Sequence, residues 1–425
     1  MISDYKNIFT SGGNPSSTYV SRTGLEEELT ENVGTNKLIT ITGQTKAGKT
    51  VLVRRFFPKE EAIWINGGAI RNEEDFWSSL FSGLDISDAE TVVTQEKDSY
   101  GTNYDGQMDF GAKFFATLKM KGSKGLKKQT SSTTSLQNSR SLPHKLAAIK
   151  SLNSSDKKPI IIIDDFHYLE EKIKKSIIHT FKDLIFDGLN LILIAIPNRE
   201  YDAVMIEKEM GARVVSIKVP QWSIDDLAQI PILGFEKLNK YISNHLIKKM
   251  ALESMGSPHL MQDFCLKLCS YSDKQSNNNS TEIQIDDEKL NEIFKKVANT
   301  IGRPIFTQLA QGPNKHGSRK ERKLKSGETV DIYGLVAHAL SILQPGMERL
   351  HFNVINKTVQ DQILEDPPQL FEITRVLKAM SQIAVSDSAS SPVLDMVSEE
   401  RCIYIMDPYF AYYLKWGDCS LSRNM

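Results

Sequence analysis

The sequence predicts a doubly wound α/β domain followed by two smaller, mainly helical domains. Short apolar runs alternate with amphipathic stretches up to about residue 220, and beyond that point the hydrophobic periodicity is helical. A length of 425 residues also exceeds what a single hydrophobic core usually supports, so two or three domains are expected.

Five apolar runs supply the expected strands of the first domain. Most are apolar on both faces, as central parallel strands between two helical layers must be. The runs are LITIT (38–42), AIWING (62–67), IIIID (160–164), LILIAI (191–196) and VVSIKV (214–219). Helical stretches between them lie at residues 50–56, 72–84, 143–152 and 170–186. We therefore expect a five-stranded parallel sheet with helices on both faces.

One segment interrupts this alternation. Residues 96–140 are rich in Gly, Ser, Thr, Lys and Gln, and such a composition buries too little apolar surface to offset its ordering entropy. We expect a flexible insertion here. Its part YDGQMDFGAKFFATLKMKG could form a short amphipathic helix or hairpin that docks on a partner, or a plain surface loop.

Composition excludes several classes of protein. The hydrophobic share of 40% and charged share of 25% are typical of a soluble globular protein, and a net charge of -1 argues against a globally basic nucleic-acid binder. The apolar runs are too short to cross a bilayer, the N-terminus lacks the regions of a signal peptide, and the cysteine spacing predicts no disulfide framework. We expect a cytoplasmic protein without membrane contact.

The octet GQTKAGKT (43–50) follows the first expected strand and opens a helix, and it fits the phosphate-binding pattern G-x-x-x-x-G-K-[ST]. Glycine at its fixed positions lets the backbone bend tightly and bring N–H groups against phosphate oxygens. Lys49 would reach the β and γ phosphates, and the Thr50 hydroxyl would coordinate Mg²⁺. The expected nucleotide-binding residues here are Gly43, Gln44, Thr45, Lys46, Ala47, Gly48, Lys49, Thr50 and Val51.

Two carboxylates end the third expected strand, at IIIIDD. Ligands of open α/β sheets bind at the carboxyl ends of the strands, so Asp164 would anchor Mg²⁺ through water. Asp165 would orient or deprotonate the attacking water. The alternative is a pair of acids that begin a solvated turn.

Both segments resemble the Walker A and Walker B motifs of P-loop ATPases of the AAA+ and STAND type, the latter including NB-ARC and NACHT proteins. The resemblance implies ATP and Mg²⁺ as ligands. Many of these ATPases carry Glu where this chain has Asp165, and the shorter side chain implies slow hydrolysis. The stretch YVSRTGLE (19–26) resembles the segment that passes the adenine, which implies nucleotide contacts for Tyr19 and Arg22. A helix cap at Thr23 would also explain it.

Further positions are implied by the same resemblance. After the fourth strand, Asn198 or Arg199 could read the γ phosphate, and Arg213 stands where AAA+ proteins often place an arginine finger. A surface arginine is the alternative for Arg213. The stretch GSP (256–258) resembles the G-x-P motif of STAND lids, in which Pro258 would lie against the base, although a simple helix-turn-helix would look similar. His259 stands where some AAA+ lids present a sensor arginine.

The C-terminal half reads as a lid, a linker and a winged helix. Helices are expected at 242–255 and 258–270, at 286–299, and at 332–343, 353–364 and 369–383, followed by a hairpin through PVLDMV and RCIYIM and a closing helix, 408–416. The segment between the lid and the winged helix carries Lys315, Arg319, Lys320, Arg322, Lys323 and Lys325. It could contact nucleic acid or an acidic partner, or be a solvated linker.

The winged helix could serve either of two functions. Its third helix carries only Arg375 and Lys378 as cations beside Glu372, which is weak for reading DNA. In STAND proteins this domain instead covers the nucleotide, and the stretch YIMDP (404–408) resembles their M-H-D motif without its His. The aromatic cluster that follows, Tyr409 included, is expected to be core.

We thus expect a nucleotide-binding domain (1–220, with the insertion at about 96–140), a lid (221–311), a basic linker (312–329) and a winged helix (330–425). The resemblance implies a prokaryotic switch ATPase in which ATP closes the lid and winged helix over the P-loop. This closure would control self-assembly or a separate sensor or effector protein, in antiviral defence by analogy. The alternatives are an AAA+ ATPase acting on DNA and a non-hydrolysing scaffold.

Overall fold

A computed structural model describes residues 5–84, 145, 148–149, 151–153, 158–196, 213–275, 281–313, 319–386 and 393–421. The chain divides into two compact units. The sheet unit consists of Glu28–Ile41 and Val53–Ile217, and the helical unit of Met1–Glu27, Thr42–Leu52 and Lys218–Met425. The expected insertion at 96–140 lies outside the described residues.

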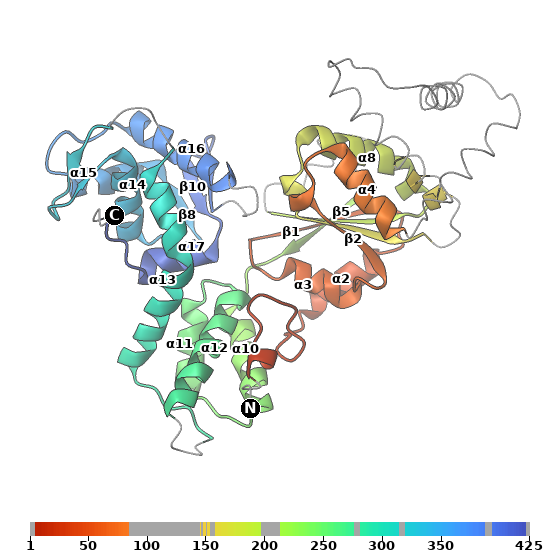
Figure 1. Ribbon diagram of the computed structural model, residues 1–425, viewed down its shortest axis with the longest axis horizontal. Helices are drawn as coiled ribbons and strands as arrows, with labels where there is room; N and C mark the ends of the chain where they lie inside the picture. Colours follow the sequence, from red (N-terminus) through yellow and green to blue (C-terminus); the bar gives the residue numbers. More distant parts are fainter. Residues whose placement is uncertain are drawn as a thin grey trace, which may run out of the picture. The chain divides into compact units, whose positions relative to one another are not determined.

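A five-stranded sheet in the order β2-β3-β4-β1-β5 confirms the predicted fold class (Figure 1). Its strands are β1 (Leu38–Gly43), β2 (Ala62–Asn66), β3 (Ile160–Asp164), β4 (Asn190–Ala195) and β5 (Val214–Val219). β2, β3 and β4 pair in parallel, which sets Asn66 opposite Asp164. α4 (Glu73–Gly83) and α8 (Glu171–Phe186) cover one face, and α2 (Thr23–Asn32) and α3 (Lys49–Phe56) cover the other.

The core of the sheet unit explains why one face of these strands is apolar. Ile161 and Ile163 of β3 are fully buried beneath α4 and α8. The Trp77 ring stacks on Phe181 at 5.8 Å between centroids, which joins the two helices. The packing against α4 and α8 therefore holds β3, including its carboxyl end, in a fixed position within the sheet unit.

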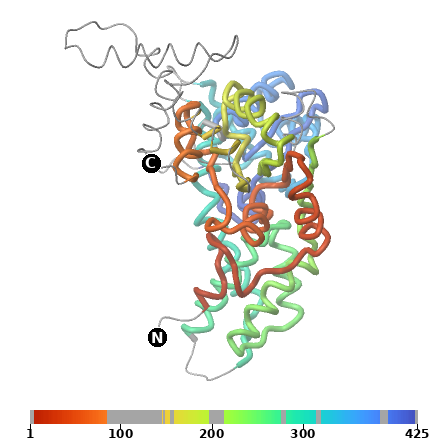
Figure 2. The backbone as a smooth tube through the Cα atoms, turned by 90° about the vertical axis from the view of Figure 1, so that its right-hand side faces the viewer, coloured from red at the N-terminus to blue at the C-terminus, as the bar shows by residue number. Residues whose placement is uncertain are grey.

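Lid helices begin directly after β5. They are α10 (Ile224–Lys237), α11 (Asn244–Glu253) and α12 (Pro258–Gln275), and the expected break between α11 and α12 is present. Ser223 caps α10 by accepting a hydrogen bond from the Asp226 amide at 3.0 Å. The short α1 (Tyr5–Ile8) lies beside them, as Figure 2 shows in red against green, and Phe9 is buried against Phe235 at 5.0 Å between ring centroids.

The helix expected at 286–299 is much longer in the structure. α13 runs from Asp287 to Gln311, through Gly302 and Pro304, which both read as helix breakers. Tertiary packing overrides these local signals, because the buried face of α13 continues through Phe306 and Leu309. α13 thereby contributes to the lid core at one end and to the C-terminal domain at the other.

The C-terminal domain is a winged helix with one added hairpin. Its elements are β6 (Arg322–Lys323), β7 (Thr329–Val330), α14 (Ile332–Leu343), β8 (Arg349–His351), α15 (Phe352–Gln362), α16 (Leu370–Ser386), β9 (Leu394–Val397), β10 (Cys402–Ile405) and α17 (Pro408–Trp416). The expected β9–β10 hairpin gains β8 as a third strand, which three residues were too few to predict. Part of the expected basic linker forms the β6–β7 hairpin instead.

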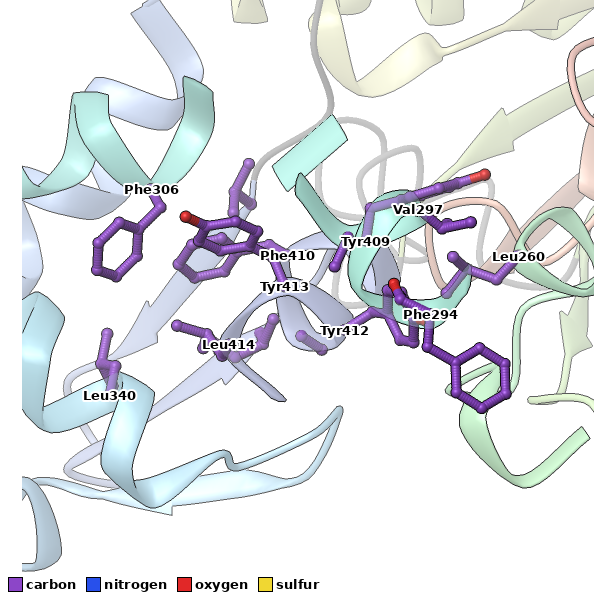
Figure 3. Close-up of a cluster of buried hydrophobic side chains, with 14 of the residues drawn as sticks. Leu260, Phe294, Val297, Phe306, Leu340, Tyr409, Phe410, Tyr412, Tyr413 and Leu414 are labelled. Atoms are coloured by element: carbon purple, nitrogen blue, oxygen red, sulfur yellow. Dashed lines mark hydrogen bonds between the residues drawn. The ribbon is translucent and has the colours of Figure 1, made fainter. Parts of the chain in front are cut away.

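α17 lies at the centre of this half of the molecule. Figure 3 shows its aromatic residues between Phe294 and Phe306 of α13 and Leu340 of α14. Tyr412 donates to the Phe294 carbonyl oxygen at 3.0 Å and is fully buried, as the sequence led us to expect for this aromatic cluster. Within the described residues, no helix combines the length and apolar character needed to cross a membrane.

Candidate functional site

The octet 43–50 forms a tight loop that leads into α3. Lys46 and Gly48 adopt left-handed backbone conformations, with φ of 61° and 89°. A Cβ at Gly43 would lie 2.7 Å from the Val219 carbonyl oxygen, so only glycine fits there. The loop therefore turns back on itself and presents its amides at the amino end of α3.

Two polar side chains of this loop, those of Thr45 and Lys49, are buried. The Lys49 ammonium is 9% exposed and donates to the carbonyl oxygens of Gly43 at 2.7 Å and Gln44 at 2.8 Å. The Thr45 hydroxyl is also buried, and it has no hydrogen-bond partner in the part of the chain that the structure describes. A buried polar atom of this kind costs free energy unless a ligand satisfies it. The cradle fits a phosphate group.

A cavity adjoins the loop within the helical unit. Seven of the predicted nucleotide-binding residues lie in its wall, namely Tyr19, Arg22, Lys46, Ala47, Gly48, Val51 and Pro258. The wall also includes Trp222, His259 and Gln262, which were not among the predicted nucleotide-binding residues.

Arg22 and Trp222 form one wall of the cavity. The Arg22 guanidinium lies 5.2 Å from the Trp222 ring centroid and donates to the Pro220 carbonyl oxygen at 3.0 Å. Its second terminal nitrogen is buried and has no hydrogen-bond partner among the described residues, and burial lowers the pKa of Arg22. The Trp222 indole donates to the Ala47 carbonyl oxygen at 2.9 Å. This residue was missed because a single tryptophan after a strand carries no pattern.

Glu26 fixes the segment that carries Tyr19 and Arg22. One carboxylate oxygen of Glu26 accepts from the Tyr19 hydroxyl at 2.6 Å and from the Arg22 amide at 3.2 Å. The other accepts from Ser21 at 2.6 Å. The segment that begins α2 therefore also forms part of the cavity wall.

The winged helix reaches the P-loop through a polar cluster. The Lys46 ammonium is ion-paired with Asp407, whose side chain is 5% exposed, and lies 4.7 Å from the Tyr409 ring centroid. Asp407 also caps α17 by accepting from the Tyr409 amide at 2.7 Å and the Phe410 amide at 3.2 Å. Sequence alone could not find this contact, because 361 positions separate Lys46 from Asp407.

Two lid residues complete this cluster. The Tyr409 hydroxyl donates to Asp263, and His259 Nδ1 lies 2.6 Å from the same hydroxyl oxygen. Burial raises the pKa of Tyr409 far above its usual range, so the hydroxyl stays protonated. Because Tyr409 donates its proton to Asp263, His259 must supply the proton of the second bond from Nδ1. Burial lowers the pKa of His259, so the neutral ring serves as this donor.

The sheet unit positions the two predicted carboxylates. Asp164 ends β3, and its carboxylate accepts from the Asp165 amide at 3.1 Å. Asp165 is left-handed, with φ 55° and ψ 39°, and precedes the buried Phe166. A Cβ at Gly67 would lie 2.5 Å from the Asp165 carbonyl oxygen, so the backbone around Asp165 is closely packed.

The remaining predicted catalytic residues are Asn198, or Arg199 in its place, and Arg213. Asn198 and Arg199 lie outside the described residues. Arg213 directly precedes β5, at the opposite strand ends from Asp164, and its guanidinium lies 4.9 Å from the Phe186 ring centroid. The described ranges contain no group of three or more His, Cys, Asp or Glu side chains placed to hold a metal ion.

Comparison with known proteins identifies the class. Residues 32–201 match the AAA domain family. The Aeropyrum pernix ORC2 protein, solved as ADPNP and ADP complexes, is 12% identical with a TM-score of 0.50, over 96% of this chain and 95% of that one. Its A. pernix relative ORC1, solved with DNA, is 11% identical with a TM-score of 0.48, over 96% of this chain and 94% of that one.

A Walker-type ATPase of Pyrococcus abyssi is 14% identical, with a TM-score of 0.47, over 93% of this chain and 96% of that one. A search among curated proteins found no similar sequence. The family match, the sheet and the P-loop agree with one another. The chain carries an AAA domain over residues 32–201, and its α/β domain has the fold of a P-loop ATPase.

Proposed function

We propose that this ATPase is a switch of the STAND kind, in which the winged helix and the γ phosphate of ATP compete for the P-loop. The observation that supports this proposal is the ion pair between Lys46 and Asp407. A buried carboxylate beside the P-loop repels a triphosphate, and Lys46 cannot pair fully with both anions. ATP therefore favours release of the winged helix. This reverses the direction expected from the sequence, in which ATP closes both domains over the loop.

The predicted phosphate-binding, metal-binding and catalytic residues each have a role in this proposal. The loop amides, the Thr45 hydroxyl and the Lys49 ammonium would take the phosphates, in exchange for the carbonyl contacts that Lys49 now makes. Thr50 and Asp164 would hold Mg²⁺, which neutralises charge on the phosphates when bound. Asp165 would orient the attacking water. Asn198 and Arg213 are proposed for γ-phosphate sensing and for an arginine finger.

The strength of the ion pair sets the size of the switch. A hydrogen bond to a charged group contributes about 1.5–3 kcal/mol, and a ligand shifts a two-state equilibrium only by its differential affinity for the states. Loss of the pair should therefore raise the fraction of molecules competent to bind ATP about ten- to a hundredfold.

Asp407→Asn tests this proposal, because asparagine caps a helix as well as aspartate does but cannot pair with Lys46. We expect the apparent Kd for a non-hydrolysable ATP analogue to fall about tenfold or more, with α17 intact. Isothermal calorimetry measures the affinity, and small-angle X-ray scattering measures the expansion on binding. Lys46→Met should have the same effect on expansion without nucleotide.

Asp286→Asn is the matched control, because Asp286 caps α13 in the same way and lies far from the P-loop along the chain. It should leave both readouts unchanged. If Asp407→Asn and wild-type protein bind the analogue equally tightly, the competition does not exist.

By analogy with STAND switches, we propose that release of the winged helix leads to self-assembly or to contact with a separate sensor or effector protein, in prokaryotic antiviral defence. Native mass spectrometry with and without the analogue tests this output. An unchanged mass in both conditions, with no companion protein, counts against assembly.

Action on DNA is the second candidate function. Winged helices can place their third helix in the major groove, and this one has exposed cations at Lys323, Lys325, Arg375 and Lys378. The other described linker cations are paired within the domain, as Arg319 with Asp331, Lys320 with Asp366 and Arg322 with Glu372. Paired cations have less to offer a phosphate backbone, which places this candidate second.

A further inference from the structure

Three consecutive residues between the last strand and the lid contact three separate parts of the helical unit. The Pro220 carbonyl oxygen accepts from Arg22 at 3.0 Å. Gln221 donates to the Met255 carbonyl oxygen at 3.2 Å, in the turn between α11 and α12. Trp222 donates to the Ala47 carbonyl oxygen of the P-loop at 2.9 Å. We call residues 220–222 the PQW segment.

The packing around the PQW segment leaves it little freedom. A Cβ at Gly256 would lie 2.4 Å from the Gln221 side chain, and Gly256 is left-handed with φ 70°. On the other side, a Cβ at Gly48 would lie 3.9 Å from the Trp222 ring. The next residue, Ser223, caps α10. The start of α10 is therefore tied to the position of the Trp222 ring.

Trp222 also faces the cavity that we assign to the nucleotide, together with Arg22, Ala47 and Pro258. A ligand there touches the Trp222 ring, the guanidinium that covers it, or the loop to which the indole is bonded. Each of these contacts moves or holds Trp222, and the lid begins two residues later.

We propose that Trp222 is a positioning residue that holds the P-loop in its binding conformation and transmits its occupancy to the lid through α10. The inference rests on the proposed nucleotide site. It adds a residue and a route that neither motif spacing nor the AAA domain match assigns.

The expected loss of nucleotide affinity follows from the one hydrogen bond that a phenylalanine at position 222 cannot make. Trp222→Phe keeps an aromatic ring beside Arg22 but leaves the Ala47 carbonyl oxygen without its indole donor. We expect the Kd for ADP and for a non-hydrolysable ATP analogue to rise about three- to tenfold. Gln221→Ala, on the lid side of the same segment, should leave the Kd within about twofold but reduce the lid response.

Trp64 provides a matched control. Its indole donates to the Phe57 carbonyl oxygen at 2.9 Å, and the Arg54 guanidinium lies 5.1 Å from its ring centroid. Trp64 therefore makes the same two kinds of contact as Trp222, a hydrogen bond to a carbonyl oxygen and a stacked arginine. It belongs to the sheet unit, however, and does not line the cavity. Trp64→Phe should lower stability comparably and leave nucleotide affinity unchanged.

Calorimetry and intrinsic fluorescence, with the full chain, separate the outcomes. Wild-type protein should show a change in tryptophan emission on binding that Trp64→Phe keeps and Trp222→Phe loses. The inference fails if Trp222→Phe binds as tightly as wild type, or if Trp64→Phe weakens binding equally. If wild-type protein binds neither nucleotide, the proposed function itself fails, and that result is distinct from either of these.

Discussion

Asp165 holds an unusual conformation for a residue with a side chain. A left-handed backbone costs a non-glycine residue about 1–2 kcal/mol, although aspartate tolerates it better than most residues. The conformation persists because Gly67 packs against the Asp165 carbonyl and Phe166 is buried beside it. Such residues cluster at functional sites, where the surrounding structure fixes a side chain in one direction. This constraint on the backbone is consistent with the proposed role of Asp165 in orienting water.

Asp165→Asn should separate binding from chemistry. Asparagine also tolerates the left-handed conformation and can still orient water, but it cannot accept a proton. We expect ATP turnover to fall about 10²–10⁴-fold, while the Kd for ATP stays within about twofold. Phosphate release under saturating ATP measures the turnover. Asp183→Asn, at an exposed position of α8, is the control, and equal turnover in all three proteins would remove the assigned role.

The residues that could be predicted are those whose type is dictated locally by phosphate chemistry. Gly43, Gly48 and Lys49 belong to a fixed spacing, and Asp164 follows an apolar run. Trp222 and Asp407 could not be predicted, since their partners are set by how distant segments meet. The stretch that contains Asp407 resembles the M-H-D motif but lacks its His, so no role was assigned to Asp407 from the sequence. In the structure, Asp407 forms the ion pair with Lys46.

At the scale of elements, α13 is where local and tertiary signals disagree most. The α/β strands were predicted within one residue at most ends, because each apolar run is bounded by polar or turn-forming residues. α13 was predicted too short because Gly302 and Pro304 weaken a helix taken alone. In the folded chain, Gly302 is needed, because a Cβ there would lie 2.2 Å from the Cβ of Tyr413.

Gly302→Ala should therefore destabilise the protein, although alanine favours a helix. The added methyl group would push α13 away from α17, and overpacking of this kind costs about 1–3 kcal/mol. Urea unfolding followed by circular dichroism measures the loss. Gly24→Ala in α2 is the matched control, because nothing lies within 4 Å of its added Cβ. It should be neutral or stabilising, and equal behaviour of the two variants would contradict the packing argument.

For the whole molecule, the charge balance bears on the choice between switch and DNA-handling ATPase. The net charge is -1, and the cations of the winged helix that remain exposed and lack an ion-pair partner are few within the described residues. Long-range attraction to a polyanion is therefore weak, and affinity for duplex DNA has to come from local contacts. Fold class alone did not decide this question, because winged helices serve both kinds of protein.

A salt titration of DNA binding decides between the switch and the DNA-handling ATPase. With about four phosphate contacts, from Lys323, Lys325, Arg375 and Lys378, the affinity for a duplex should fall about 10²-fold between 50 and 200 mM salt, with a Kd no tighter than about 10⁻⁶ M. Fluorescence anisotropy measures both quantities. Nanomolar binding with a steeper salt dependence, lost on substitution of Arg375 and Lys378 by alanine, would favour the DNA-handling ATPase.

The length of α13 has a mechanical consequence. At 1.5 Å per residue its 25 residues span about 37 Å, and along one continuous core Phe294 packs against Phe264 of the lid while Phe306 packs against Tyr413 of the winged helix. A rotation of the winged helix is therefore transmitted to the lid through α13. A protein that binds the outer surface of the winged helix would then speed the exchange of a bound nucleotide without contacting the cavity.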